Sequence, residues 1–126
     1  MKGTHALLIV LSIAALASPG DAIAQEATER YIPIGESPGV SGEETYLGEC
    51  VRYDSQDQVL QVQGRAGERS IRLTEHTRIW LDRSRARKSN LVGDTDDLVP
   101  GRRIEVKYVD PEDETVADWV KVEIAE

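Results

Sequence analysis

The chain has 126 residues, with 15 Lys and Arg against 23 Asp and Glu, which gives a formal net charge of −8 at pH 7. This charge argues against general binding to nucleic acid, whose phosphates would be repelled. Cys50 is the only cysteine, so no disulfide within the chain can stabilise the fold, and stability depends on one modest hydrophobic core.

Residues 1–24 have the layout of a secretory signal peptide. Lys2 precedes an apolar run over residues 6–17, a polar break covers residues 18–21, and Ala22-Ile-Ala24 is a pattern that signal peptidase accepts. The apolar run is shorter than the roughly 20 residues that span a bilayer, which argues against a retained membrane helix. We therefore expect cleavage after Ala24, a periplasmic or secreted product, and no stable membrane insertion.

Residues 25–43 mix Pro, Gly and Glu without sustained periodicity. That composition is typical of a flexible leader. The apolar side chains of Tyr31, Ile32 and Ile34 leave a second possibility open, in which the segment packs onto the following domain as a short extended arm.

Residues 44–126 are predicted to form one small β-barrel domain. Apolar and polar residues alternate, and turn signals recur at short intervals. The expected strands cover residues 45–53, 59–63, 70–73, 77–81, 102–109 and 116–124. Leu98-Val-Pro-Gly101 predicts a type II turn, with Pro fixing one φ angle and Gly supplying a positive one. Five or six short strands favour a closed barrel, because an open sheet would leave long edges prone to aggregation.

Short motifs recur along this domain. They are Gly48-Glu-Cys-Val-Arg-Tyr-Asp54, Leu60-Gln-Val62, Thr77-Arg-Ile79, Asp97-Leu-Val-Pro-Gly101, Ile104-Glu-Val106 and the strand from Ala117 to Val122. Over about residues 46–124 they resemble a family of small exported bacterial β-barrel domains of unknown function. The resemblance implies an all-β fold with a five- to six-stranded OB-like barrel and brings no catalytic residues. It also implies that Cys50 occupies an apolar core position.

The sequence indicates neither a metal site nor a catalytic constellation. The chain after residue 24 has one Cys, one His and no Met, too few soft ligands for copper or zinc. Asp94, Asp96 and Glu105 imitate the spacing of an EF-hand calcium loop, but Leu98-Val99 occupies positions that need an oxygen ligand and a glycine. His76 is the single candidate base, without an orienting group. We therefore expect no enzyme activity, no metal and no cofactor, and a surface or strand-end position for His76.

Residues 82–97 break the β pattern, and so long a connection in a small domain is often functional or mobile. Their basic cluster either pairs with the acidic ends of the chain or docks an anionic partner, such as a polysaccharide, a lipid headgroup or an acidic protein surface. Trp80 and Trp119 either cap the barrel or, if exposed beside Arg, suit a sugar ring or a peptide. The predicted binding residues are Arg78, Trp80, Arg83, Arg85, Arg87 and Lys88.

These features predict an exported, non-catalytic binding or interaction module of the cell envelope. Its expected partner is an anionic envelope component or an envelope protein that docks on the basic loop. Two alternatives remain open. One is a structural or stress-related accessory protein that assembles with another envelope protein, and the other is an enzyme of unknown type.

Overall fold

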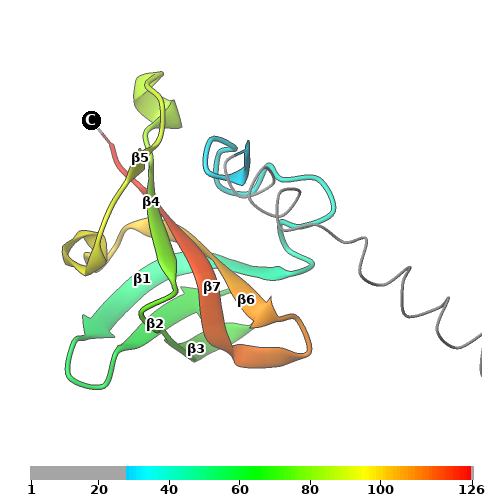
Figure 1. Ribbon diagram of the computed structural model, residues 1–126, viewed down its shortest axis with the longest axis vertical. Coiled ribbons are helices and arrows are strands. Elements are labelled where there is room, and N and C mark those ends of the chain that lie inside the picture. The colour runs from blue at the N-terminus through cyan, green and yellow to red at the C-terminus, as the bar shows by residue number, and fades with distance from the viewer. Residues whose placement is uncertain (1–27, 126) are drawn as a thin grey trace, which may run out of the picture.

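The computed structural model describes residues 28–125, so the predicted signal peptide and cleavage site lie outside the described residues. This part of the chain forms seven strands and two short 3-10 helices (Figure 1). The elements are β1 (Thr45–Asp54), β2 (Val59–Gly64), β3 (Gly67–Arg72), β4 (Arg78–Asp82), η1 (Ser84–Ala86), β5 (Leu91–Val92), η2 (Thr95–Asp97), β6 (Arg103–Asp110) and β7 (Asp113–Glu123). Within this range, none of the helices has the length and hydropathy of a membrane span.

Five of the strands close into a barrel. β1 pairs antiparallel with β2 and with β6, β2 pairs with β3, and β6 pairs with β7. The ring closes where β3 meets β7 in parallel, at Arg72 and Val116. The predicted fold class, a small OB-like barrel, is therefore confirmed. β4 and β5 extend the sheet beyond the ring: β4 runs parallel to β7, and β5 pairs with the outer side of β4.

All six expected strands are found, and their ends differ from the expected ones by at most three residues. β3 begins early, at Gly67, because a tight turn at residues 65–66 joins it to β2. The predicted turn before β6 is also confirmed: Gly101 has φ +91°, and the amide of Arg102 donates to the carbonyl of Val99 at 3.2 Å. The sequence did not indicate β5.

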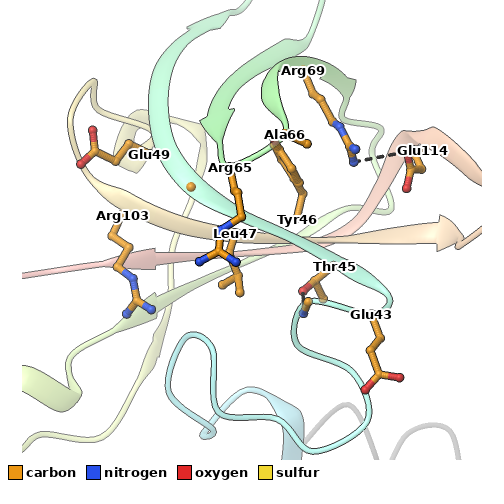
Figure 2. Close-up of a pocket in the computed structure, with 12 residues that line it drawn as sticks. Glu43, Thr45, Tyr46, Leu47, Glu49, Arg65, Ala66, Arg69, Arg103 and Glu114 are labelled. Carbon is orange, nitrogen blue, oxygen red and sulfur yellow. Dashed lines mark hydrogen bonds and ion pairs between the residues drawn. The ribbon is translucent and has the colours of Figure 1, made fainter.

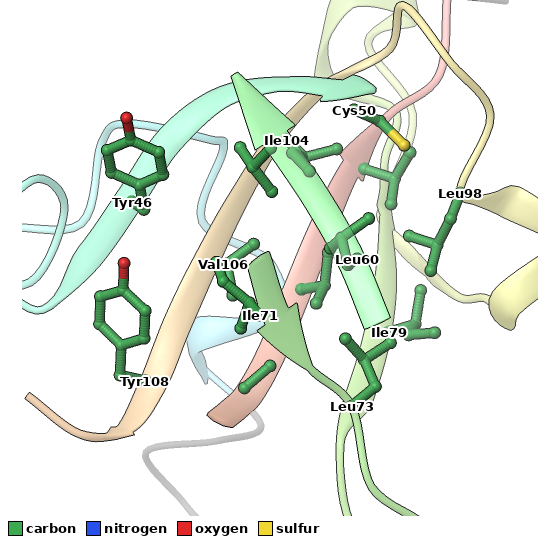
Figure 3. Close-up of a cluster of buried hydrophobic side chains, with 14 of the residues drawn as sticks. Tyr46, Cys50, Leu60, Ile71, Leu73, Ile79, Leu98, Ile104, Val106 and Tyr108 are labelled. Atoms are coloured by element: carbon green, nitrogen blue, oxygen red, sulfur yellow. The ribbon is translucent and has the colours of Figure 1, made fainter. Parts of the chain in front are cut away.

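The barrel interior holds the hydrophobic core (Figure 3). Its fully buried aliphatic side chains come from alternate positions of β2, β3, β6 and β7, as the period-2 pattern requires. They are Leu60, Val62, Ile71, Ile104, Val106, Val120 and Val122. Cys50 on β1 joins this cluster and is 2% exposed, which confirms the predicted burial of its thiol.

We expect Cys50→Val to leave the Tm almost unchanged and Cys50→Asp to prevent folding, because a free Cys packs like a small apolar residue while an unpaired buried carboxylate costs several kcal/mol. Burial raises the pKa of the Cys50 thiol, and Arg102 lowers it by a smaller amount. The protonated thiol therefore contributes its full stability below its unfolded pKa, and that contribution is lost as the pH rises towards the higher folded pKa. Thermal denaturation checks both variants. Rapid maleimide labelling of the native protein at neutral pH would contradict the core assignment.

Residues 28–44, called here the N-terminal segment, pack against the outside of the barrel (Figure 1). Ile34 is fully buried, and backbone amides of the segment donate to side chains of β4 and β6. The prediction of a flexible leader is therefore wrong for residues 28–43, and the packed alternative is the one found. The segment forms a series of turns, however, and not an extended arm.

Candidate functional site

Charged side chains lie buried between the barrel wall and the N-terminal segment. Asp82 of β4 is 2% exposed, and Glu105 of β6 and Lys121 of β7 are fully buried. Glu105 and Lys121 face each other across the β6–β7 pair, and Trp80 is the partner of Lys121 on the other side. These three charged side chains and Trp80 point away from the hydrophobic core. They are buried because the N-terminal segment covers this outer face of the sheet.

The N-terminal segment satisfies these buried charges. The amide of Ile34 donates to Asp82 Oδ2 at 2.8 Å, and the amide of Gly35 donates to Glu105 Oε1 at 3.0 Å. Lys121 Nζ donates to Glu29 Oε2 at 2.9 Å and to the carbonyl of Ile32 at 2.8 Å. The Thr45 hydroxyl, at the start of β1, donates to the second oxygen of Glu105 at 2.8 Å. Burial of these groups is tolerated because each has hydrogen-bond partners.

Two of the polar side chains under the segment also hold the basic loop, defined here as residues 83–90. Asp82 Oδ1 accepts the amide of Ser84 at 2.9 Å. Asn90, which is buried at the far end of the loop, accepts the amide of Arg83 at 2.9 Å and donates to the carbonyl of Arg30 at 2.8 Å. The loop is thus closed at its base and joined to the N-terminal segment, although its composition suggested a solvated connection.

The structure separates the six predicted binding residues. Trp80 is 4% exposed and packs against Trp119, with 5.5 Å between the ring centroids. The prediction that Trp80 contacts a ligand is therefore wrong in this structure, because the N-terminal segment covers its face of the sheet. Arg78 is exposed but begins β4, roughly 13 Å along the strand from Asp82 and the basic loop. Arg83 is half-buried, and its Nε donates to the carbonyl of Ser89 at 2.8 Å, so it braces the loop.

The remaining three predicted residues lie exposed on the basic loop: Arg85, Arg87 and Lys88. In the described part of the chain, neither Arg87 nor Lys88 makes an ion pair. Arg85 instead reaches Glu123 at the end of β7, with 3.0 Å between Nη1 and Oε2. The internal pairing that the sequence left open is thus present for one of the three exposed cations.

Beside Arg85 the surface forms a hollow of about 440 Å³, lined also by Arg102, Arg103 and Glu123. Glu123 lies between two arginines, since its Oε1 is 3.7 Å from Arg103 Nη1. Arg102 Nη1 donates to the carbonyl of Asp97 at 2.9 Å. Sequence reasoning missed Arg102 and Arg103, although two consecutive arginines directly after the Pro-Gly turn are a signal that could have identified them.

A second hollow, of about 710 Å³, lies between β1, the turn from β2 to β3 and the end of the N-terminal segment (Figure 2). It shares Arg103 with the first hollow and adds Arg65 and Arg69. Arg69 stacks 4.1 Å from the ring centroid of Tyr46 and pairs with Glu114 at 3.2 Å. Its Nη1 also donates to the Tyr108 hydroxyl at 2.9 Å, which raises the pKa of Arg69. Arg69 is therefore a fixed cation.

Across residues 28–125, no three His, Cys, Asp or Glu side chains gather in a way that could hold a metal ion. The calcium-like spacing is not realised in space, because Glu105 is engaged under the N-terminal segment while Asp94 caps η2 by accepting the amide of Asp96 at 2.8 Å. His76 is exposed, with 3.6 Å between its Nε2 and Oε2 of the neighbouring Glu75. This confirms its predicted surface position.

Comparisons with known proteins add no relative: no family model, no curated protein and no solved structure matches the chain at a significant level.

Proposed function

We propose that this protein is an exported, non-catalytic binding module that docks an anionic component of the cell envelope. Its docking surface consists of Arg85, Arg87 and Lys88 on the basic loop and Arg102 and Arg103 beside it. The signal-peptide pattern of residues 1–24 and the resemblance to exported barrel domains support the envelope as the compartment. One observation carries the proposal: exposed cations stand on a loop whose base is fixed by hydrogen bonds to the buried side chains of Asp82 and Asn90.

The fixed base of the loop matters for affinity. A loop that is already ordered loses less conformational entropy when it binds, so more of the contact energy is retained. Guanidinium groups add specificity, because their planar donors match carboxylates, sulfates and phosphates in pairs. The net charge of −8 opposes the approach of any anion, so affinity depends on these close contacts and falls as salt rises.

A second candidate function, assembly with another envelope protein, is favoured by β5. This strand lies at the end of the sheet order, and its two residues, Leu91 and Val92, are 45% and 65% exposed. An edge strand with exposed apolar side chains can pair with a strand of a partner. The basic loop precedes β5 directly, so one partner could contact both features.

Reversing the two unpaired cations, in Arg87→Glu/Lys88→Glu, should abolish retention of the chain comprising residues 25–126 on a heparin matrix at low salt. The Tm should change by a few degrees at most, since exposed charges contribute about 0–1 kcal/mol each. The matched control is Arg52→Glu/Arg72→Glu, which changes the net charge equally at exposed positions of β1 and β3.

The control variant should keep most of its retention, and wild-type retention should weaken with added salt. Equal loss in both variants would show that general charge, and not the docking surface, is responsible. Failure of the wild type to be retained on heparin, on anionic lipid vesicles and on envelope extract would overturn the proposed function.

A further inference from the structure

The two hollows are neighbours that meet at one side chain. Arg103, the first residue of β6, lines both, and its side chain is half exposed. Their volumes, about 440 and 710 Å³, each fall within the roughly 300–1,000 Å³ usual for sites that take small ligands or single units of a longer one. A ligand that fills one hollow and passes Arg103 therefore enters the other.

Among residues 28–125, every basic residue that lines the two hollows is an arginine. They are Arg85 and Arg102 in the first, Arg65 and Arg69 in the second, and Arg103 in both. The carboxylates of Glu123 and Glu114 are already paired with members of this set. The other two acidic residues, Glu43 and Glu49, lie on opposite sides of Leu47, and in Figure 2 their carboxylates point away from Arg65.

Arg65 is the least expected member of this set. It occupies the exposed turn between β2 and β3, and among residues 28–125 it makes no ion pair. Its side chain nevertheless extends back along the barrel towards Leu47 of β1, with the guanidinium on the same side of that strand as Arg103 (Figure 2). Arg65 and Arg103 are thus two cations with the apolar, partly exposed side chain of Leu47 beside them. This arrangement matches an anionic chain in which charged groups alternate with rings.

We infer that the ligand is a linear polyanion of the acidic-polysaccharide class, which runs from the docking surface past Arg103 into the second hollow. This inference rests on the proposed function and goes further, because it assigns the second hollow and Arg65 to the same ligand. A compact anion or a single headgroup would occupy one hollow, whereas a chain of several charged sugars engages both. Bidentate pairing of arginine with carboxylate or sulfate supplies the charged contacts, and Leu47 supplies apolar surface for a ring.

The test compares a heparin tetrasaccharide with a heparin dodecasaccharide, titrated into the chain comprising residues 25–126 and followed by calorimetry. Arg65→Ala should weaken the dodecasaccharide about tenfold, the loss expected for one charge-assisted contact, and leave the tetrasaccharide unchanged. It should also lower the salt dependence of dodecasaccharide binding. Arg52→Ala, an exposed control on β1, should bind both oligosaccharides like the wild type. Arg65 lies on an exposed turn, so the Arg65→Ala variant should fold normally. Its Tm, compared with that of the wild type, checks this.

The outcomes separate the two proposals. If Arg65→Ala binds the dodecasaccharide like the wild type while Arg87→Glu/Lys88→Glu loses both ligands, the extension into the second hollow is wrong and docking stands. If anionic phospholipid vesicles bind the wild type and neither oligosaccharide does, the ligand is a headgroup and the polysaccharide inference is wrong. If nothing anionic binds the wild type, the proposed function fails as well.

Discussion

Gly48→Ala should destabilise the barrel by about 3 kcal/mol, the upper end of what overpacking costs, and lower the Tm by roughly 12–24 °C. Gly48 of β1 is paired directly with Gly64 of β2. A Cβ added at Gly48 would lie 2.3 Å from the carbonyl oxygen of Gln63, and one added at Gly64 would lie 2.5 Å from the Tyr46 ring. These neighbours are backbone and a buried ring, so the strands must separate to admit a methyl group.

Thermal and urea denaturation measure this effect, and Gly39→Ala is the comparison. Gly39 has φ +73°, and nothing lies within 4 Å of its added Cβ. At this position alanine costs only the energy of adopting the left-handed backbone conformation, about 1–2 kcal/mol. If Gly48→Ala costs no more than Gly39→Ala, the close approach of β1 and β2 is not a requirement of the fold.

The second large effect is expected at Lys121, which is fully buried although it carries a charge. Lys121→Met keeps the length of the side chain but removes the donor to Glu29 and to the carbonyl of Ile32. Breaking a fully buried ion pair on one side costs about 3–5 kcal/mol, because the remaining charge is uncompensated. The side chain of Glu29 is 16% exposed, so the loss is expected at the lower end of that range, about 3 kcal/mol. The Tm should fall accordingly, and hydrogen exchange should speed up at the amides of Ile34 and Gly35, where the N-terminal segment is held.

A double-mutant cycle tests the cause of this loss. Glu29→Gln added to Lys121→Met removes the stranded carboxylate, so the double variant should be more stable than the sum of the two single losses predicts. Strict additivity of the two changes would mean that Lys121 stabilises the protein through contacts other than its ion pair with Glu29, such as the approach of its Nζ to 4.6 Å from the centroid of the Trp119 ring.

The strands were predictable because the alternation of apolar and polar residues along the sequence indicates which side chains face the core. Glu105 and Lys121 follow the same alternation and lie on the outer face of the sheet, but alternation does not distinguish an outer face in water from one that another segment covers. The cover is the N-terminal segment, whose composition suggests flexibility. Its stability comes from one buried apolar side chain, Ile34, and from backbone groups whose charged partners lie far along the chain. No local pattern encodes these contacts.

The candidate site was predictable in part for a similar reason. Arg85, Arg87 and Lys88 form a run in the sequence, so their shared loop could be identified. Arg65 and Arg103 come from a turn and a strand that reach one surface only because β1 pairs with β2 on one side and with β6 on the other. The error at Trp80 has the same origin, since its burial depends on a segment that precedes it by about 50 residues in sequence.

The contacts that join the N-terminal segment to the barrel and the basic loop have a kinetic consequence. They link residues that are 48 to 92 positions apart, whereas the turns between β1, β2 and β3 are local. Contacts between distant residues close large loops and form slowly. The hairpins are therefore expected to assemble first and the segment to dock late. Until it does, Asp82 lacks the amide of Ile34 and Asn90 lacks the carbonyl of Arg30. A partly folded chain therefore carries the cations of the docking surface on a loop that keeps its own hydrogen bonds but is not yet joined to the N-terminal segment.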